Sequence, residues 1–271
     1  YFVPHMETYK KKAFMFGHLI NKLMECYIGA RQEDDRDHFK NKRIDLPGQL
    51  LTGLFRQLYK KMHKEVAVSA HKAFEQYGNI NIRSIIKTKT ITNGMKYALS
   101  TGNWGINGSL TVRTGISQVL NRQSYMSTLS HLRRIDSPIG KDGKLTAPRQ
   151  LHGSHAYRIC PCETPEGQAC GLVKNLALTC EISTSTPSKH IHDILLSLGV
   201  ESLDNVDCIK NEQCIVFVNG YFLGYTSNSP MLMKRMKLLK KSCDISPLTG
   251  IAFDSKHNEL RIHTDGGRCC R

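Results

Sequence analysis

The chain has 271 residues, of which 40% are hydrophobic, so it is long enough for one large domain or two ordinary ones with a buried core. Its 38 lysine and arginine residues outnumber 23 acids and give a net charge of +15, which indicates an anionic partner or an acidic neighbouring surface. The sequence contains no apolar run of about 18 residues and no signal-peptide pattern, which argues against a membrane span and secretion. Ten cysteines without regular spacing are typical of reduced thiols in a nuclear or cytosolic protein.

Two amphipathic helices are predicted in the first third of the chain. Apolar residues at three- and four-residue spacings predict a helix over residues 13–30 that packs through one face. That face would consist of Phe16, Leu19, Ile20, Leu23 and Tyr27. A second helix is predicted over residues 50–74, with a core-facing stripe of Leu50, Leu54, Leu58, Met62 and Val66.

Residues 101–115 contain four glycines and two asparagines without periodicity, and we predict an exposed, mobile loop there. A polar helix is predicted to follow, from an N-cap at Ser117 through Arg134. Because this helix mixes apolar and basic residues, its polar side should face a hydrated, anionic partner, or the helix should lie at the edge of the fold.

After Leu178 the pattern becomes that of an α+β module, and we predict a boundary near residues 176–186, where TSTPS is typical of a linker. The sequence predicts a short helix in HIHDILLSLG, a hairpin in CIVFVNGYFLGY that turns at Asn219 and Gly220, and strands in GIAFD and ELRIHT. It also predicts a basic helix that starts at Pro230 and is capped by Ser229.

The positive charge is concentrated between Arg83 and Arg158. Twelve lysines and arginines there face only Asp136 and Asp142, so twelve minus two gives +10 of the total +15. A solvated basic face is the usual explanation of a charge run. No acid occurs between Glu75 and Asp136, and so long an acid-free stretch favours contact with phosphates.

Histidines, cysteines and glutamates cluster in residues 149–178, RQLHGSHAYRICPCETPEGQACGLVKNLAL. A zinc site would recruit His152, His155, Cys160, Cys162 and Cys170. Structural zinc usually pairs cysteines two to four residues apart, whereas only Pro161 separates the first two cysteines here, so the spacing argues against zinc.

Two enzymatic interpretations of the same stretch are weaker. Glu163 and Glu166 could form an acid/base pair, but Pro165 disrupts the helix that would align them. Cys160 or Cys170 could pair with a histidine as a nucleophile, yet ten cysteines and twelve histidines make such pairs common by chance. The prolines and glycines favour a rigid turn that positions its side chains.

The stretch CPCETPEGQACGLVKNLAL resembles, nearly residue for residue, a signature of the second-largest (beta-type) subunit of multisubunit DNA-directed RNA polymerases. Other segments resemble the same subunit in the same order: DDRDHFKNKRIDLPG, KYALSTGNWG, GISQVLNRQSYMSTLSHLRRIDSPIGKDGKL, PRQLHGSH and TDGGR. The resemblance is greatest toward the RNA polymerase II type, and we expect an internal fragment of that subunit. Departures at Pro47, Ala156, Tyr157, Cys162 and Gly267 suggest a divergent eukaryote or a large DNA virus.

The resemblance implies an α+β, multi-region fragment that contains parts of the lobe and protrusion, the fork and the external 1 region. Residues 1–45 would be the end of the lobe, 46–95 the returning, helical part of the protrusion, 96–175 the fork, and 176–271 an incomplete external 1 region. The glycine-rich loop around residues 106–115 would be fork loop 2, near the downstream edge of the melted DNA. The polar helix would match the segment that in bacterial relatives lines the rifamycin pocket beside nascent RNA.

The resemblance also implies template-directed RNA synthesis, with this segment shaping the wall of the active centre. The expected nucleic-acid-binding residues are Arg113, Gln118, Arg122, His131, Arg133 and Arg134. Pro165 and Glu166 would position the active centre. No catalytic residue or metal ligand is expected here, because the family holds its catalytic Mg²⁺ on aspartates of the largest subunit, with help from an acidic pair later in this subunit.

The implied partners are the largest subunit and other polymerase subunits, template DNA, nascent RNA and nucleoside triphosphates, with no membrane. The expected location is the nucleus, or the host cytoplasm or virion for a viral protein. Two other classes remain open at this stage: a free-standing basic nucleic-acid-binding or scaffold protein without catalysis, and a zinc-dependent enzyme.

Overall fold

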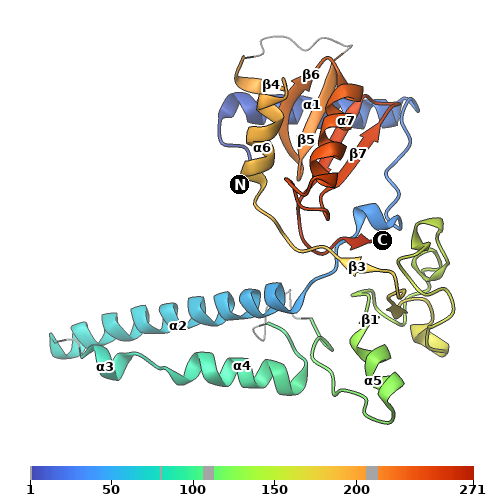
Figure 1. Cartoon of the computed structure of the whole chain (residues 1–271). Coiled ribbons are helices and arrows are strands. Elements are labelled where there is room, and N and C mark those ends of the chain that lie inside the picture. Colours follow the sequence, from blue (N-terminus) through green and yellow to red (C-terminus); the bar gives the residue numbers. More distant parts are fainter. Residues whose placement is uncertain (1, 80, 106–112, 206–212) are drawn as a thin grey trace. The chain divides into compact units, whose positions relative to one another are not determined.

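The computed structural model describes residues 2–79, 81–105, 113–205 and 213–271 (Figure 1). The chain forms two compact units. The first unit comprises Tyr1–Arg43, His152–Arg158 and Thr179–Arg271, and the second comprises residues 44–151 and 159–178. Helices and short strands in one chain confirm the expected α+β class. None of the helices in the described ranges is long and apolar enough to cross a membrane.

A five-stranded sheet in the order β4-β6-β5-β8-β7 forms the centre of the first unit. The strands are β4 (Glu201–Ser202), β5 (Cys214–Val218), β6 (Tyr221–Thr226), β7 (Gly250–Asp254) and β8 (Glu259–His263). All neighbours are antiparallel except β5 and β8, which are parallel. The predicted hairpin is confirmed, because Asn219 and Gly220 join β5 to β6 with φ values of 51° and 82°, which suit an Asn-Gly turn. The two later strands, β7 and β8, are confirmed as well.

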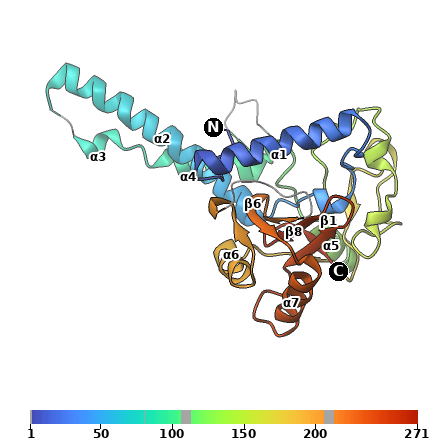
Figure 2. The same cartoon turned by 90° about the horizontal axis from the view of Figure 1, so that it is seen from above.

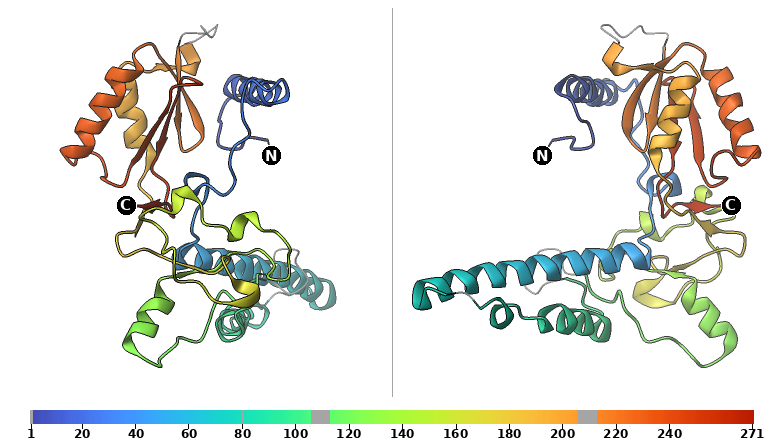
Figure 3. Two further views of the ribbon diagram at one scale, coloured as in Figure 1. Left: turned by 90° about the vertical axis from the view of Figure 1, so that its right-hand side faces the viewer. Right: turned by 60° about the vertical axis from the view of Figure 1, so that its left-hand side comes forward.

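Helices cover both faces of this sheet (Figure 3). Helices α6 (Ser188–Ser197) and α7 (Ser229–Lys241) lie on one face, and α1 (Tyr9–Tyr27) lies on the other. Side chains alternate along β5, so Val216 and Val218 pack toward α6 and α7, whereas Phe217 packs with Phe222 in the core toward α1. The predicted cap of α7 is wrong by one residue, because the side chain of Asn228, not Ser229, accepts the Met231 N–H.

Three short 3-10 turns and a small ladder complete the first unit. The turns are η1 (Phe39–Asn41), η3 (Gly153–His155) and η5 (Leu203–Asn205), and the ladder pairs β3 (Glu181–Ile182) with β9 (Cys269–Cys270). The Phe39 N–H donates to Ser154 Oγ at 3.1 Å, so residues far apart in the chain hold η1 and η3 together.

Helix α1 confirms the first predicted helix, but its packed face is not the predicted one. The five apolar residues expected to pack are exposed, with Leu23 at 68% and Tyr27 at 86% exposure. The side that meets the sheet carries Phe14 and Met15, together with the polar His18. A basic residue can also lie on this side, because a buried carboxylate of the sheet forms an ion pair with it.

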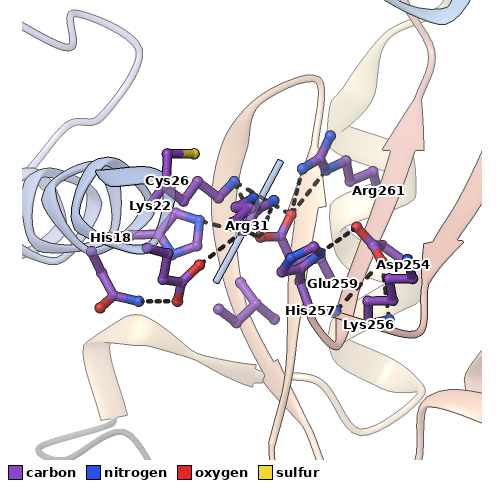
Figure 4. A network of polar contacts seen from close by, with 12 residues as sticks. His18, Lys22, Cys26, Arg31, Asp254, Lys256, His257, Glu259 and Arg261 are labelled. Atoms are coloured by element: carbon purple, nitrogen blue, oxygen red, sulfur yellow. Dashed lines mark hydrogen bonds and ion pairs between the residues drawn. The ribbon is translucent and has the colours of Figure 1, made fainter. Parts of the chain in front are cut away.

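That carboxylate belongs to Glu259 of β8, which is 1% exposed (Figure 4). Its Oε1 lies 3.2 Å from Lys22 Nζ and 3.3 Å from Arg31 Nη1, and its Oε2 lies 2.6 Å from Arg261 Nη2. The pKa of Glu259 is lowered, since these hydrogen bonds and charges outweigh the opposing effect of its burial. Lys22 of α1 and Arg31, which follows the helix, therefore hold α1 to the sheet through this carboxylate, and Arg261 of the same strand adds a third cation.

Acidification should destabilise the first unit because of His18. Burial, followed by the charge of Lys22, lowers the pKa of His18 from 6.5 to about 4, so the folded chain keeps this ring neutral. Below pH 6.5 the unfolded chain binds a proton that the folded chain does not. The free energy of unfolding should therefore fall by about 2 to 4 kcal/mol as the pH falls from 6.5 to 4.

Denaturant unfolding at several pH values between 7 and 4 measures this effect, with His18→Leu as the comparison. The substitution should remove part of the pH dependence and leave the part due to His192 and His263, whose pKa values burial also lowers. Identical pH dependence in both proteins would contradict the assignment to His18.

The second unit begins with a pair of helices (Figure 2). Helix α2 (Pro47–Tyr77) packs on α4 (Lys89–Thr101), and the short α3 (Ile82–Ile85) lies between them in the sequence. Leu54 and Leu58 of the predicted stripe are buried with Ala98, whereas Leu50, Met62 and Val66 are half-buried. Trp104 packs on this core and donates its Nε1–H to the Leu50 carbonyl at 2.8 Å.

The rest of the second unit contains α5 (Tyr125–Leu132), turns and a short strand pair. Its other elements are η2 (Ala147–Arg149), η4 (Gly167–Ala169), and the pair β1 (Arg134–Ile135) and β2 (Lys174–Asn175). The predicted helix start at Ser117 is wrong, because α5 begins after Ser124, whose side chain caps the Ser127 N–H. Asn121 also accepts the Gln123 N–H, a local bond that competes with helix formation. Of the predicted mobile loop, residues 106–112 lie outside the described ranges.

Candidate nucleic-acid interface

All six residues predicted to bind nucleic acid lie in the second unit. Arg122 is in the non-helical segment before α5, and Arg134 is in β1, where its backbone pairs with Asn175. Both side chains are exposed, and neither has a hydrogen bond or ion pair with any residue that the structure describes. Their charge is therefore available to an external anion, and the planar guanidinium suits a phosphate.

The other two arginines have partners within the chain. Arg113 Nη1 lies 2.7 Å from Asp45 Oδ2, and both side chains are about half exposed. Arg133 donates from Nη2 to the Ala177 carbonyl at 2.5 Å, and its backbone N–H closes the end of α5. Arg133 therefore has a structural role, and Arg113 shares its charge with a carboxylate.

Gln118 and His131 are brought together in a hydrogen-bonded clasp. His131 Nδ1 accepts the Asn121 N–H at 3.0 Å, which leaves the ring proton on Nε2. Nε2 then donates to Gln118 Oε1 at 3.0 Å, and Gln118 Nε2 donates to the Gly115 carbonyl at 3.0 Å. The clasp fixes residues 115–121 on α5 and so holds the neighbouring Arg122. Sequence reasoning missed Asn121, although an asparagine before a helix start is a typical local acceptor.

The predicted rigid turn is present around Pro165 and Glu166. Thr164 closes it, because its Oγ1 donates to the Val173 carbonyl at 3.0 Å and accepts the Gly171 N–H at 2.9 Å. Pro165 and Glu166 are exposed at its tip, and the carboxylate of Glu166 has no partner among the described residues. Glu163 anchors the turn to α5 through a short hydrogen bond from Ser130 Oγ.

Arg149 is an organising residue that the sequence did not reveal. Its Nη1 donates to the carbonyls of Gln168 at 2.5 Å and Cys170 at 3.0 Å, and its Nη2 donates to that of Lys141 at 2.9 Å. The guanidinium thus ties the rigid turn to residues 141–143. Arg149 belongs to the basic segment of the sequence, but its guanidinium forms hydrogen bonds within the second unit.

The residues weighed for zinc are divided between the units. His152 belongs to the first unit, where Nε2 lies 2.8 Å from Asp35 Oδ2 and Nδ1 lies 2.7 Å from Ser154 Oγ, and His155 is buried nearby. Cys160, Cys162 and Cys170 belong to the second unit. Among residues 2–79, 81–105, 113–205 and 213–271, no three His, Cys, Asp or Glu side chains form a group that could hold a metal ion.

Three family models match successive parts of the chain. The model for RNA polymerase Rpb2, domain 2, matches residues 1–45, domain 3 matches residues 118–182, and domain 4 matches residues 216–271. The domain 3 match includes five of the six predicted nucleic-acid-binding residues and the rigid turn.

Curated relatives match nearly the whole chain. DNA-directed RNA polymerase II subunit 2 of Arabidopsis thaliana is 47% identical over 268 residues, which cover 98% of this chain and 22% of that protein. The RNA polymerase II subunit RPB2 of Schizosaccharomyces pombe is 45% identical over 275 residues, or 99% and 23% of the two chains. The archaeal subunit Rpo2 of Sulfolobus acidocaldarius is 35% identical over 287 residues, or 100% and 25%.

The chain spans about a quarter or less of the length of these relatives. The three domain matches confirm the expected multi-region character of the chain. The chain therefore belongs to the family of second-largest, beta-type subunits of multisubunit DNA-directed RNA polymerases, and it is similar to the RNA polymerase II type.

Proposed function

We propose that the chain acts as part of an RNA polymerase II-type enzyme that synthesises RNA from nucleoside triphosphates on a DNA template. The observation that carries this proposal is the exposure of Arg122 and Arg134, unpaired among the described residues, within the match to Rpb2 domain 3. Template DNA and nascent RNA supply the phosphates that such cations neutralise. No observation favours the free-standing binding or scaffold protein, since the relatives above are named as polymerase subunits.

Within this proposal each feature of the second unit has a role. Arg122 and Arg134 contact phosphates directly, and Arg113 does so while sharing its charge with Asp45. The clasp of Gln118 and His131 presents Arg122, and the outer edge of Gln118 offers a further hydrogen bond to RNA. The rigid turn places Glu166 beside the RNA end. The expected lobe, protrusion, fork and external 1 boundaries, at residues 45, 95 and 175, belong to the same proposal.

We assign phosphoryl transfer and its Mg²⁺ to other parts of the enzyme, because the resemblance implies that the aspartates that hold the catalytic ion belong to the largest subunit. The largest subunit and the remaining polymerase subunits are the proposed protein partners. The proposed location is the nucleus, as the RNA polymerase II names of the relatives suggest.

Replacing Arg122 or Arg134 with alanine in the assembled polymerase should weaken the elongation complex. Each substitution should also reduce the log-log slope of the salt dependence by about one unit, because one phosphate contact is lost. Lysine at either position should restore the charge but only part of the bidentate geometry. Dissociation of the complex across a salt series measures both effects.

Arg133→Ala is the matched control, since Arg133 is bonded to the Ala177 carbonyl. This substitution should lower the melting temperature and leave the salt slope nearly unchanged. If Arg122→Ala and Arg134→Ala behave in the same way, with an unchanged slope and a lowered melting temperature, these arginines bridge protein segments and the proposed phosphate contact is wrong.

A further inference from the structure

Helix α7 presents a second basic surface, in the first unit and outside the region discussed above. Leu232 and Met236 on its inner side are buried in the core between the helix and the sheet. The opposite side carries the exposed residues Met231, Lys234, Arg235, Lys237, Leu238 and Lys241. We call these six residues the outer face of α7. It lies on the side of the sheet away from α1 (Figure 3).

The cations of this face are not neutralised within the described residues. No acid occurs in the sequence between Glu212 and Asp244, and the four basic side chains have no ion pair or hydrogen bond there. Lys240, by contrast, donates to the Thr249 carbonyl at 2.9 Å. The unpaired cations are therefore a property of the outer face rather than of the whole helix.

Helix stability does not account for all of these charges. Lys241 lies in the last turn, where it interacts favourably with the helix dipole. Lys234, Arg235 and Lys237 lie before that turn, and like charges three or four residues apart, as at Lys234 and Lys237, destabilise a helix. A partner of opposite charge would offset this repulsion.

Apolar side chains lie among the cations. Met231 is 54% exposed and Leu238 is 60% exposed, and the two are seven residues apart, so they lie on the same side of the helix. The phosphates of a nucleic acid would contact only the cations and leave the apolar side chains exposed. The face also contains no aromatic side chain on which a base could stack. A peptide that alternates carboxylates with apolar side chains would use both kinds of residue.

We propose that the outer face of α7 is a docking site for an acidic, amphipathic segment of a partner protein. Carboxylates of the segment pair with Lys234, Arg235, Lys237 and Lys241. Its apolar side chains cover Met231 and Leu238. Charge complementarity and the mixed character of the face select this partner over a nucleic acid.

Fluorescence anisotropy on the 271-residue chain tests the proposal with three labelled probes. The first is a synthetic helix-forming peptide of about 16 residues, with Asp and Glu on one side and Leu at helical spacing. The second has the same charge, with serine in place of every leucine. The third is single-stranded DNA of about 16 nucleotides. Melting curves verify that each protein variant is folded.

The amphipathic peptide should bind more tightly than the serine peptide. The triple variant Lys234→Ser/Lys237→Ser/Lys241→Ser should weaken its binding by about tenfold or more, and Leu238→Ser should weaken it by about threefold or more. The matched control Lys60→Ser/Lys64→Ser/Lys72→Ser removes three exposed lysines from α2, and should change the affinity by less than about twofold.

Four outcomes would overturn the proposal. Equal losses in the two triple variants would mean that the peptide responds to net charge and not to α7. Equal binding of the serine peptide, or DNA binding that depends on Lys234, Lys237 and Lys241 but not on Leu238, would make the face a general polyanion or nucleic-acid surface. As a positional readout, a photoreactive group on the peptide should crosslink to residues 229–241, and crosslinking elsewhere also contradicts the proposal.

Discussion

Replacing Gly171 with alanine should disrupt the turn that carries Pro165 and Glu166, and should lower the free energy of unfolding by about 3 kcal/mol or more. Gly171 has φ +72°, a conformation that other residues rarely adopt, and a Cβ built there would lie 2.3 Å from the Arg149 carbonyl oxygen. The Arg149 backbone cannot rotate away from the new Cβ as the end of a flexible side chain could. The substitution must therefore displace Arg149, whose guanidinium holds the carbonyls of Gln168 and Cys170.

Gly167→Ala is the matched control in the same turn. Its φ is +79°, close to that of Gly171, but no other atoms lie within 4 Å of a Cβ built there. The cost should therefore be the conformational strain alone, about 1 kcal/mol. The difference between the two variants isolates the contact with Arg149.

Urea unfolding followed by tryptophan fluorescence measures the difference, because Trp104 is the single tryptophan and belongs to the core of α2 and α4 in the same unit. In the assembled polymerase, Gly171→Ala should also slow RNA extension more than Gly167→Ala. Equal costs for the two substitutions would show that the turn accommodates a side chain beside Arg149.

The parts of the fold set by local chemistry could be predicted from the sequence. The hairpin follows from alternating apolar residues around Asn219 and Gly220, because the turn type and the strand period require only neighbouring residues. Leu54 and Leu58 could be assigned to the core for a similar reason, since a four-residue spacing brings them to one side of a helix.

Polar bonds, one distant and others local, account for the errors. Periodicity identified α1 as amphipathic but selected the wrong packed face, because the choice depends on Glu259, which is 237 residues after Lys22. The start of α5 depends on how the side chains of Asn121 and Ser124 bond to the backbone, which composition does not specify. In both cases polar bonds overrode the apolar pattern.

In the candidate site, too, the sequence predicted some features and could not predict others. Charge statistics located the basic segment, but they could not separate arginines bonded inside the unit from those left exposed. Arg133 and Arg149 donate to carbonyls 44 and 19 residues away, which no local pattern reveals. Arg122 and Arg134 remain the strongest candidates for phosphate contact because the described structure leaves them unpaired.

The second large effect is expected at the carboxylate that holds α1. Glu259→Gln should lower the free energy of unfolding of the first unit by about 3 to 5 kcal/mol, because it leaves Lys22 and Arg261 without a counter-charge and leaves Arg31 with Glu25 alone. Burial already lowers the pKa of Lys22, which shows that its charge is poorly solvated even with Glu259 present. Without the carboxylate, α1 should separate from the sheet at a lower denaturant concentration.

Asp204→Asn, in η5, is the matched control, because Asp204 also pairs with a lysine of α1. Asp204 Oδ2 lies 2.9 Å from Lys11 Nζ, but its side chain is 53% exposed, so water can replace the lost ion pair. The cost should be below about 1 kcal/mol. Comparing the two substitutions separates burial from the mere presence of a lysine partner on α1.

Hydrogen exchange, read peptide by peptide, locates the effect. Amides of α1 and β8 should lose protection in Glu259→Gln and keep it in Asp204→Asn, while α2 and α4 of the second unit provide an internal reference. Adding Lys22→Met to Glu259→Gln should recover at least about 1 kcal/mol, because one of the uncompensated cations is then removed. If Glu259→Gln costs no more than Asp204→Asn, the three cations are solvated well enough without the carboxylate, and the apolar contacts of Phe14 and Met15 hold α1 on the sheet instead.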